Sequence, residues 1–565
     1  MSMTASSAFD CWLAGVMPDD RPALQAMDSV EREDAFWREL VFGTGGMRGK
    51  LGLGPNRMNA YTVGRVTQGL ANWLKSSTEK PTVALCRDTR RGSEEFVRRT
   101  ASVLAANGIH SFIYERVEPT PALSFAVREL GCSAGVVITA SHNPAVYNGY
   151  KVYGADGCQI TVTTAKAIQA AVNAVDSFES VKAMPYDKAV ERGLVKLIDE
   201  RVLEKYIALA AAQSTGEDLS SLCVAYTPLH GVGLECVSEA LAAAGVTNMY
   251  VADEQAIKDG DFPTCPKPNP EESDALELCI GLGNRVGADV LLATDPDCDR
   301  LRVVVRHAGE YKALSGDEFG LLLLEHMVHR AEERGEDLSR KVACTTVVTH
   351  PMADDLARVY GFELRRTLTG FKYIGEQIGL LESQGREGDF LVGIEESLGY
   401  LSGTNVRDKC GVTSCVLACC VTSRWKTGGL DLVDAIDLLY DRFGYWAQCQ
   451  VSKQFDGQGG VEAMSAIMSR LRRDPPKMLA GLVVKRIIDY AVGAQMPVVN
   501  PSGPAPQTLP PSNVLEMRLI GGSRVIIRPS GTEPKIKSYV FAKSSTPDAA
   551  SRLLRRIESE MAKVL

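Results

Sequence analysis

Short apolar runs alternate with longer segments of helical period along most of this chain, and each run ends in a polar or glycine-containing loop. Six of these runs read as buried strands, namely "PTVALCRDT", "SAGVVITASHN", "LCVAYTPLHG", "ADVLLATDPD", "KVACTTVVTH" and "DFLVGIEES". Between them lie segments such as "SEEFVRRTASVLAANG", in which Gly108 is a natural helix stop. This alternation predicts α/β units with mainly parallel sheets.

The length and net charge of the chain narrow the classes of protein to which it can belong. A chain of 565 residues is too long for one hydrophobic core and is expected to divide into about three or four domains. The net charge of −8 gives no overall basic field for nucleic acid. No apolar run approaches the roughly 18 residues that span a bilayer, and the N-terminus lacks the basic start of a secretory signal. We expect a soluble, cytoplasmic protein with neither a nucleic-acid nor a membrane partner.

The fifteen cysteines do not indicate a disulfide framework or a metal site. Their number is odd, the chain is long, and no CxxC pair occurs. Cys415, Cys419 and Cys420 are spaced as on one buried helix. We therefore expect reduced core thiols that behave as small hydrophobic side chains.

The C-terminal stretch follows a different pattern. Residues 514–531 and 535–542 look like antiparallel strands joined by turns, and a final helix is predicted with Thr546 as its N-cap and Pro547 at its first position. These features predict an α+β end domain. The proline-rich segment at residues 496–513, "MPVVNPSGPAPQTLPPSN", is predicted to be an exposed loop.

Three loops that close predicted strands carry the chemistry. Ligands of open α/β sheets bind beyond the carboxyl ends of the strands, and the loops at Ser141, Asp295 and Glu395 lie there. About one domain separates each loop from the next. This spacing suggests a repeated α/β unit, although the sequence shows no clear repeat.

The loop "TDPDCDR" alternates Asp295, Asp297 and Asp299 directly after an apolar run. Three such carboxylates can face one hard cation such as Mg²⁺, and they repel one another unless a cation neutralises them. The pattern argues against calcium-sensor behaviour, because an EF-hand needs glycine and glutamate where Arg300 and Arg306 stand. The motif also resembles the haloacid dehalogenase superfamily, in which the first aspartate is a nucleophile, but that motif has Thr or Val where Asp299 stands.

A second charged loop, "RPSGTEPK", collects groups that suit a phosphate near the C-terminus: Arg528, Ser530, Gly531, Thr532 and Lys535. An arginine fork, hydroxyl groups and a glycine N–H donate hydrogen bonds, and the lysine adds charge. A plain turn would explain Pro-Ser-Gly but not the flanking cations. We interpret the loop as a phosphate cradle.

Weaker candidates surround these motifs. In "GIEESLGY", Glu395 and Ser397 can point the same way from an extended segment and hold sugar hydroxyls, although an exposed acidic turn is equally compatible. Further cations occur in "FGTGGMRGKLG", "TGFKYIG" and "NVRDKCG", where they are Arg48, Lys372, Arg407 and Lys409. The first of these segments is not a Walker A loop.

Taken together and in this order, "TASHNPAVYNGYK", "DPDCDR", "GIEESLG" and "RPSGTEPK" resemble the four signature loops of the α-D-phosphohexomutase superfamily. The opening "FGTGGMRGKLGLGPNRMN" is similar to the branch of phosphoglucomutases that also includes phosphopentomutases. The resemblance covers about residues 40–565. It implies an α/β protein with four domains around a central cleft, namely three repeated α/β domains and a C-terminal α+β domain.

The resemblance also gives the domains expected boundaries. Residues 1–215 would form an N-terminal extension with the phosphoserine domain, and residues 216–312 the metal-binding domain. Residues 313–452 would form the sugar-binding domain, and residues 453–565 the phosphate-binding domain.

The residue roles that the resemblance implies follow the motifs. Ser141 would be the phosphoserine, and Ser141 with Asp295, Asp297 and Asp299 would hold Mg²⁺. The other catalytic candidates are His142, Lys151, Arg48 and Arg300, which would position the phosphoryl group, manage protons or supply charge. The substrate-binding candidates are Lys372, Glu395, Ser397, Arg407, Lys409, Arg528, Ser530, Gly531, Thr532 and Lys535.

The implied activity is the interconversion of glucose 1-phosphate and glucose 6-phosphate, with Mg²⁺ as cofactor and glucose 1,6-bisphosphate as intermediate and activator. Phosphopentomutase is the close alternative, and phosphomannomutase is less favoured because "EES" resembles the glucose-type sugar loop. From other classes, a haloacid dehalogenase-like phosphatase would use Asp295, and a sugar-phosphate sensor would be non-catalytic. A monomer or weak homodimer is expected.

Two residues depart from the family pattern. Cys298 stands where Ala or Gly is common, and it should be tolerated because the aspartates hold the metal. Cys410 replaces the usual acid that follows "DK". This second change leaves Lys409 in place but alters the expected substrate pocket.

Overall fold

The computed structural model describes residues 5–175, 178–455, 459–503, 508–529 and 535–565 of the chain. These residues form two compact units that interleave along the sequence. The first unit comprises Met1–Ala313, Gly375–Gln384 and Leu398–Arg424, and the second comprises Leu314–Ile374, Gly385–Ser397 and Trp425–Leu565.

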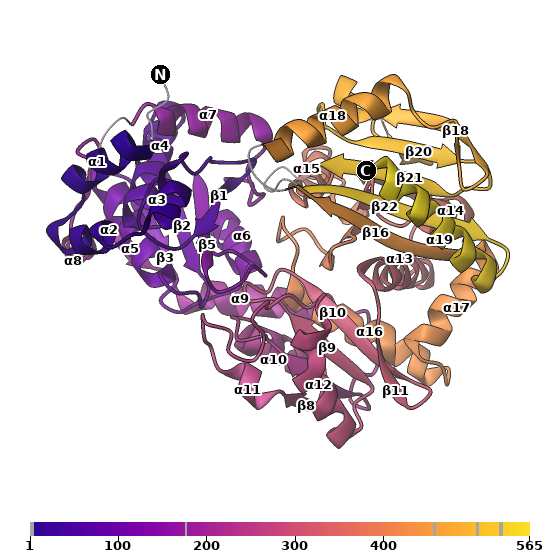
Figure 1. Ribbon diagram of the computed structural model, residues 1–565. Helices are drawn as coiled ribbons and strands as arrows, with labels where there is room; N and C mark the ends of the chain where they lie inside the picture. Colours follow the sequence, from indigo (N-terminus) through magenta and orange to yellow (C-terminus); the bar gives the residue numbers. More distant parts are fainter. Residues whose placement is uncertain (1–4, 176–177, 456–458, 504–507, 530–534) are drawn as a thin grey trace. The chain divides into compact units, whose positions relative to one another are not determined.

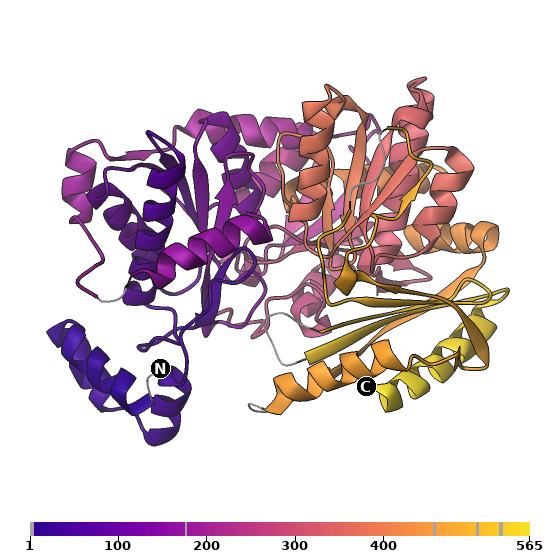
Figure 2. The ribbon, with the colours of Figure 1, turned by 90° about the horizontal axis from the view of Figure 1, so that it is seen from above.

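The first unit begins with three short helices and a mixed sheet (Figures 1 and 2). The helices are α1 (Ala5–Gly15), α2 (Arg21–Gln25) and α3 (Ser29–Phe36). The sheet has the order β1-β5-β4-β2-β3-β6, from strands β1 (Gly46–Lys50), β2 (Thr82–Arg87), β3 (His110–Ile113), β4 (Ala134–Ile138), β5 (Tyr147–Gly154) and β6 (Val195–Leu197). The accompanying helices are α4 (Ala60–Ser77), α5 (Ser93–Ala106), α6 (Thr120–Glu129), α7 (Val162–Asn173), α8 (Tyr186–Glu191) and α9 (Glu200–Ala211).

A second sheet in the same unit has the order β11-β10-β9-β7-β8. Its strands are β7 (Cys223–Thr227), β8 (Asn248–Val251), β9 (Val290–Thr294), β10 (Leu301–His307) and β11 (Glu310–Ala313), and its helices are α10 (Leu234–Ala243), α11 (Asp253–Ala256) and α12 (Ser273–Val286). The apolar run of β9 is buried at every position. It therefore delivers the aspartate loop from the interior of the unit.

The second unit carries a third sheet, in which β14, β12, β13 and β19 are neighbours in that order. The third-repeat elements in this unit are β12 (Val342–Thr346), β13 (Glu363–Thr367), β14 (Phe390–Glu395), β19 (Val498–Val499), α13 (Gly316–Glu333), α14 (Met352–Tyr360) and α17 (Leu432–Phe443). The strand β15 (Gly399–Leu401) and most of α15 (Lys372–Ser383) and α16 (Gly411–Thr427) fall in segments of the first unit. The cysteines of α16 are buried along one helix, as predicted, and all fifteen cysteines are free thiols.

The last sheet is antiparallel, and helices α18 and α19 pack on it (Figure 1). Its order is β16-β22-β21-β20-β18-β17, and the elements are β16 (Tyr445–Gln454), α18 (Gly459–Arg473), β17 (Met478–Leu479), β18 (Leu482–Asp489), β20 (Leu515–Leu519), β21 (Arg524–Pro529), β22 (Lys535–Ser544) and α19 (Pro547–Val564). Thr546 caps α19 by accepting a hydrogen bond from the N–H of Ala549. The predicted α+β end domain is thus confirmed.

The prediction of an exposed loop at residues 496–513 is wrong in part. Within that segment, β19 pairs with β13 in antiparallel fashion, and Met496 and Leu509 are buried. The two valines of "PVV" supply β propensity and reach the open edge of the third sheet. Proline at the edge of a sheet is tolerated because no ladder hydrogen bond is needed there. Residues 504–507 lie outside the described part of the chain.

The three α/β sheets repeat one arrangement, which confirms the repeated α/β unit that the loop spacing suggests, although the residues themselves show no clear repeat. In each, a first strand (β2, β7 or β12) pairs in parallel with a second (β3, β8 or β13) and with a third (β4, β9 or β14). Ser141, Asp295 and Glu395 stand at or just after the ends of β4, β9 and β14. The three predicted loops are therefore one topological position used three times.

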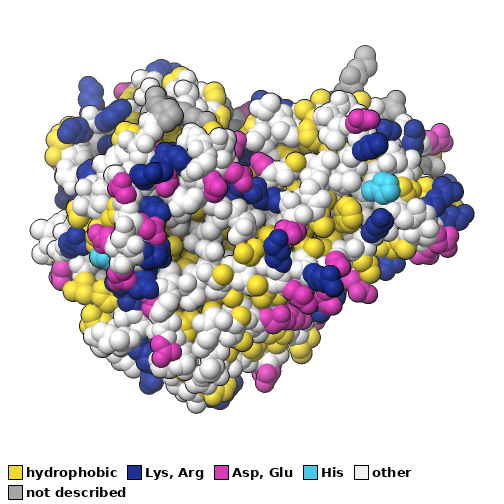
Figure 3. Space-filling model, turned by 180° about the vertical axis from the view of Figure 1, so that it is seen from behind, with side chains coloured by type: hydrophobic (Ala, Val, Ile, Leu, Met, Phe, Trp, Pro, Cys, Tyr) yellow, Lys and Arg dark blue, Asp and Glu magenta, His cyan; other side chains and the backbone are white. Residues whose placement is uncertain are grey.

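The surface shows no segregation of charge on the face drawn in Figure 3. Lysine and arginine side chains there are interspersed with aspartate and glutamate. Among the described residues, no helix combines the length and apolar character needed to cross a membrane.

Candidate active site

Ser141 lies three residues beyond the end of β4, in a backbone conformation that serine seldom adopts. Its φ of 52° is in the left-handed region, which costs a non-glycine residue about 1–3 kcal/mol. The N–H of Ser141 donates to Thr139 Oγ1 at 2.8 Å, and the side chain is buried. The surrounding contacts must therefore hold this turn in place.

The aspartate loop follows β9 and is shaped by its own first carboxylate. The backbone N–H groups of Asp299 and Arg300 donate to Asp295 Oδ1 at 3.1 and 3.0 Å. Cys298, at φ 52°, makes the sharp turn between them. As a small side chain buried within the unit, it fits this position without displacing the aspartates.

Asp295, Asp297 and Asp299 come together as the sequence predicts, with ligand atoms within 4.8 Å of one another. All three are buried, and the Oδ1 atoms of Asp297 and Asp299 have no hydrogen-bond partner among the residues that the structure describes. Buried carboxylate oxygens without partners are costly unless a cation meets them. Hard oxygen donors are the ligands that Mg²⁺ prefers, so the donor set fits a divalent cation.

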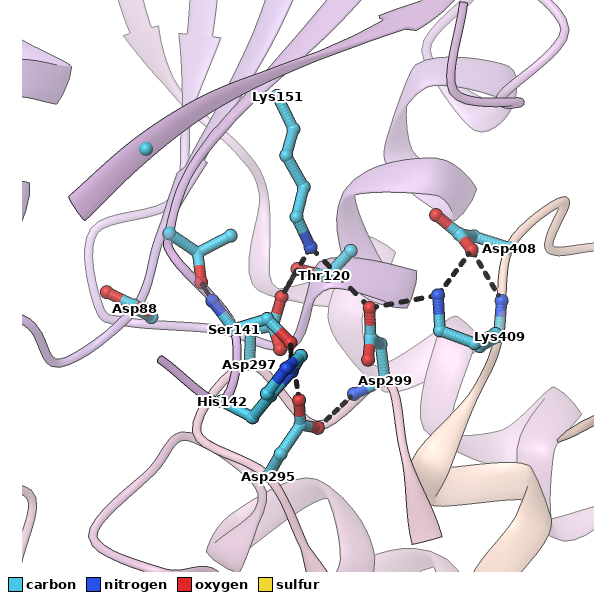
Figure 4. Close-up of polar contacts among 12 residues, drawn as sticks. Asp88, Thr120, Ser141, His142, Lys151, Asp295, Asp297, Asp299, Asp408 and Lys409 are labelled. Carbon is cyan, nitrogen blue, oxygen red and sulfur yellow. Dashed lines mark hydrogen bonds and ion pairs between the residues drawn. The ribbon is translucent and has the colours of Figure 1, made fainter. Parts of the chain in front are cut away.

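Ser141 reaches this cluster directly, although it comes from a different sheet (Figure 4). Its hydroxyl donates to Asp295 Oδ2 at 2.7 Å, and His142 Nδ1 lies 3.2 Å from the Ser141 Oγ atom. Burial and the charges of Asp297 and Asp299 hold the pKa of the Asp295 carboxyl well above its ordinary value. A bound cation would oppose that shift.

Two lysines lie against the other two aspartates (Figure 4). Lys151 Nζ is 2.8 Å from Asp297 Oδ2 and 3.5 Å from Asp299 Oδ2, and Lys409 Nζ is 3.3 Å from Asp299 Oδ2. Burial lowers the pKa of the Lys151 ammonium, but Asp297 and Asp299 raise it by more. Lys151 is therefore a protonated cation in this arrangement.

Arg48, His142 and Arg300 lie around the same serine loop. Arg48 extends from β1 and donates to Asn143 Oδ1 at 2.9 Å. Burial and the guanidinium groups of Arg300 and Arg48 hold the pKa of His142 well below its ordinary value, so its imidazole is neutral at pH 7. Arg300 follows Asp299, and its Nε is 4.0 Å from Asp299 Oδ1.

The sugar-loop candidates belong to the second unit. Glu395 closes β14 and accepts a hydrogen bond from the N–H of Gly370 at 3.1 Å. Lys372 begins α15, with Nζ 5.5 Å from the centroid of the Tyr373 ring. Ser397 is half-buried two residues after Glu395. The structure thus brings the two predicted loops at residues 370 and 395 into contact.

Arg407 is placed differently from what its predicted role requires. Its guanidinium is buried, donates to Glu382 Oε2 at 2.7 Å and also bonds the carbonyl of Thr404. Contact with a sugar phosphate would need another side-chain conformation. Cys410, three residues on, is buried beside Tyr206 and Thr413, and burial raises the pKa of its thiol. It supplies no negative charge there.

The predicted phosphate cradle is described only at its ends. Arg528 lies near the end of β21 and Lys535 begins β22. Ser530, Gly531 and Thr532 lie outside the described residues. Their role in binding phosphate stays a prediction.

Sequence reasoning missed two residues that hold the site. Thr120 Oγ1 donates to Asp297 Oδ2 at 2.9 Å, and the Thr120 N–H donates to the Asp297 carbonyl at 2.9 Å. Arg90 bonds the backbone of the serine loop. A signal existed for Arg90, because "RDTRRG" follows a predicted strand as the other site loops do. None existed for Thr120, whose partner is 177 residues away.

Comparison with known proteins gives independent evidence on the family of this chain. Three domain families match this chain, described as phosphoglucomutase/phosphomannomutase alpha/beta/alpha domains I, II and III, at residues 39–179, 204–309 and 315–442. A phosphoglucomutase of Staphylococcus saprophyticus is 34% identical over 512 residues, covering 90% of this chain and 91% of that one. One from Staphylococcus aureus is 33% identical over 520 residues, or 92% of each chain.

Among solved structures, the chain is similar to parafusin, a phosphoglucomutase from Paramecium. The TM-score is 0.67 at 17% sequence identity, over 93% of this chain and 96% of that one. At this identity the likeness concerns the fold. It agrees with the repeated α/β arrangement and the antiparallel end domain described above.

Proposed function

This chain belongs to the phosphoglucomutase/phosphomannomutase family and is an intramolecular phosphotransferase of the phosphoglucomutase type; from that premise we propose how its residues carry the reaction. Ser141, phosphorylated in the resting enzyme, would exchange its phosphoryl group with glucose 1-phosphate and glucose 6-phosphate by way of glucose 1,6-bisphosphate. The observation that carries this proposal is the Ser141 hydroxyl, 2.7 Å from Asp295 in a buried cluster of three aspartates.

A serine oxygen is a poor nucleophile and a poor leaving group unless charge is managed around it. Mg²⁺ held by Asp295, Asp297 and Asp299 would neutralise phosphoryl oxygens and stabilise charge on the Ser141 oxygen. Arg48 would help to hold the phosphoryl group from the other side of the loop. The buried setting supports this assignment, because electrostatic interactions strengthen where water is excluded.

In the transfer, the bond from phosphorus to the Ser141 oxygen breaks as a sugar hydroxyl oxygen bonds to the same phosphorus. The proton of that hydroxyl ends on the Ser141 oxygen. Lys151, a protonated cation held at Asp297 and Asp299, would donate a proton to the Ser141 oxygen as its bond to phosphorus breaks. Its amine would then take up the proton of the sugar hydroxyl, so that one proton passes from the sugar to the serine in net terms. The neutral His142 beside Ser141 would orient the serine oxygen.

The bisphosphate must then present its other phosphate to Ser141, so the sugar is recognised in two orientations. Glu395 and Ser397 would hold sugar hydroxyls, and Arg528 and Lys535 would hold the phosphate that does not react. Lys372 and Lys409 would bind the substrate as further cations. Arg407, Ser530, Gly531 and Thr532 stay substrate-binding predictions. A cytoplasmic location and a monomeric or weakly dimeric state also stay predictions.

The geometry argues against the nucleophilic aspartate of a haloacid dehalogenase-like phosphatase. Asp295 Oδ1 accepts two backbone hydrogen bonds and Oδ2 accepts the Ser141 hydroxyl. Attack of Asp295 Oδ2 on phosphorus would have to displace the Ser141 hydroxyl from this hydrogen bond.

The test is the location of the covalent phosphate. Purified enzyme should carry phosphate on the "TASHNP" peptide, and substrate should discharge it while glucose 1,6-bisphosphate restores it. The ester should be stable to acid, whereas an aspartyl phosphate would be trapped by hydroxylamine. Ser141→Ala should remove the label and nearly all mutase activity, and Ser133→Ala, at the other end of β4, should keep both. A substrate-dischargeable phosphate on the "TDPDCDR" peptide of Ser141→Ala would refute the proposal.

The substrate is tested on the same preparation. We expect kcat/KM to be highest for glucose 1-phosphate when it is compared with mannose 1-phosphate and ribose 1-phosphate. A higher value for ribose 1-phosphate would make the enzyme a phosphopentomutase. A higher value for mannose 1-phosphate would make it a phosphomannomutase.

A further inference from the structure

A buried arginine next to β2 binds the serine loop from inside the protein. Arg90 NH1 donates to the carbonyl oxygens of Pro144 and Tyr147, both at 3.0 Å, and NH2 donates to those of Ser141 and Asn143. The Arg90 side chain is fully buried, which shields these bonds from solvent. One guanidinium thus joins four carbonyls of a seven-residue turn.

The guanidinium is itself fixed in position. Asp88 Oδ2 lies 3.3 Å from Arg90 Nε, and Asp88 Oδ1 accepts hydrogen bonds from the Arg90 N–H at 3.0 Å and from Ser93 Oγ at 2.9 Å. The ring of Phe262, from the second sheet's domain, lies 4.9 Å from Arg90 Cζ. Asp88 and Phe262 are also buried. A charged pair enclosed in this way has little freedom to move.

This attachment explains how Ser141 stays in its unfavourable conformation. A serine at φ 52° would relax to an ordinary turn if its peptide groups were free to rotate. Arg90 holds the carbonyl of Ser141 itself and three that follow, which fixes the peptide planes on the C-terminal side. The Thr139 hydroxyl fixes the N–H side at 2.8 Å. The position of Ser141 Oγ relative to Asp295 depends on both.

Only arginine has the shape for this task. Its planar fork presents parallel N–H donors at fixed angles, whereas a lysine ammonium is a compact charge with three tetrahedral donors. A lysine at position 90 would keep the charge beside Asp88 but could not span the four carbonyls. Charge and geometry can therefore be separated by substitution.

We infer that Arg90 is a positioning residue for phosphoryl transfer: it holds the Ser141 turn so that the serine oxygen meets Asp295 and the metal site. The inference rests on the proposed function, in which Ser141 carries the phosphoryl group. Arg90 touches neither substrate nor phosphorus in this role. Its effect should fall on kcat and on the state of the phosphoserine rather than on sugar binding.

The test compares Arg90→Lys and Arg90→Met with the wild type and with Arg91→Met. Arg91 is the matched control, because its exposed guanidinium pairs with Asp261 and not with the serine loop. For Arg90→Lys we expect kcat to fall about 100-fold, the effect of misplacing a reacting group by about 1 Å, with KM changed by less than about threefold. Arg90→Met should lose at least as much, and Arg91→Met should match the wild type.

The activity of each variant is expressed per amount of folded enzyme. A loss of activity that comes only from unfolding is thereby separated from a slower reaction. Each variant is loaded with glucose 1,6-bisphosphate, its phosphoserine is quantified, and the rate of discharge by glucose 6-phosphate is measured in a single turnover. The ³¹P resonance of the phosphoserine should shift or broaden in Arg90→Lys and not in Arg91→Met. Mg²⁺ binding, measured by calorimetry, should persist in all variants.

Three results would overturn the inference. A wild-type discharge rate per phosphoserine in Arg90→Lys would show that the four bonds do not position Ser141. An Arg90→Lys protein that fails to fold would assign Arg90 to folding alone. If the wild type turns over sugar phosphate but carries no phosphoserine, the proposed function fails first, and this inference falls with it.

Discussion

Two of the three clustered aspartates are balanced by lysines, and the third is not. Asp297 and Asp299 contact Lys151 and Lys409, whereas Asp295 has a serine hydroxyl and backbone N–H groups as partners. Burial raises the pKa of the Asp297 carboxyl, but Lys151 lowers it by more, while the pKa of Asp295 is raised. The negative charge is thus uneven, and a cation among the three carboxylates would relieve Asp295 most.

Removal of one carboxylate from the aspartate cluster should raise the concentration of Mg²⁺ that the enzyme needs for activity. We expect chelation of divalent cations to abolish turnover and Mg²⁺ to restore it. In Asp297→Asn the Mg²⁺ concentration for half-maximal activity should rise about tenfold or more, which corresponds to about 1.4 kcal/mol. Asp289→Asn is the matched control, because an amide oxygen can still accept the hydrogen bond from the Cys223 N–H. Full activity in chelator would remove the metal assignment.

The burial of Glu118 should make the stability of the folded protein depend on pH, independently of the reaction. Burial raises its pKa to about 7, although Arg116, at 3.6 Å, opposes the shift. The folded state then binds this proton more tightly than the unfolded state, whose carboxyl has the ordinary value of 4.5. The contribution of Glu118 to stability therefore falls as pH rises from about 4.5 to about 7, and it is constant above that.

Glu118→Gln should remove this dependence. Relative to the wild type, the variant should gain about 2–3 kcal/mol in free energy of unfolding between pH 5 and pH 8. Urea denaturation at the two pH values measures the difference. Glu200→Gln, at an exposed carboxylate, serves as control. An equal difference between variant and wild type at both pH values would contradict the assigned shift.

At the scale of elements, helix α6 joins the serine domain to the metal loop through its first residue. Thr120 stands at the N-terminus of α6, where backbone N–H groups lack helical partners. Its N–H donates a hydrogen bond to the Asp297 carbonyl, and its hydroxyl donates one to the Asp297 carboxylate. The start of one helix in the first repeat therefore sets the orientation of a proposed metal ligand in the second.

Thr120→Val keeps the shape of the side chain and removes the hydroxyl. Loss of a partner that orients a metal ligand typically costs about 10–100-fold in metal affinity or activity, and we expect a loss in that range for Mg²⁺-dependent turnover. Thr422→Val is the matched control, since Thr422 Oγ1 donates within its own helix to Ala418. Titration of activity with Mg²⁺ gives the comparison. Equal Mg²⁺ responses in the two variants would leave Thr120 without this role.

The elements that could be predicted are those whose signal is local. The runs leading to Ser141, Asp295 and Glu395 are buried strands because apolar β-formers fill each of them, and Thr546 with Pro547 marks α19. The strand β19 could not be predicted, because its pairing with β13 depends on an open sheet edge. Thr120 could not be assigned, because its partner lies 177 residues away along the chain. Arg90 follows a predicted strand, but its partners are backbone carbonyls, which no side-chain pattern marks.

At the scale of the molecule, the chain forms two units whose segments interleave. Residues 375–384 and 398–424 return to the first unit after the chain has entered the second. Lys409, which contacts Asp299, arrives on the later of these segments. The resemblance to a family predicted the repeated α/β domains, but no local pattern marks where the chain returns. The boundaries expected from the sequence stay predictions.

The last prediction concerns the phosphate that does not react. Ser141 and the three aspartates, all in the first unit, are assigned to the reacting phosphate, so the other phosphate needs a binding group of its own. Arg528 belongs to the second unit, is half-buried near the end of β21 and lies beside the Tyr539 hydroxyl. If both orientations of the sugar place their unreacted phosphate at the "RPSGTEPK" loop, Arg528→Ala should raise KM for glucose 1-phosphate and glucose 6-phosphate by similar factors. Charge-assisted hydrogen bonds contribute about 1.5–3 kcal/mol, so we expect about tenfold or more. Arg486→Ala, an exposed arginine on β18 of the same sheet, should leave both values unchanged. An effect confined to one of the two substrates would show that the loop does not serve both orientations.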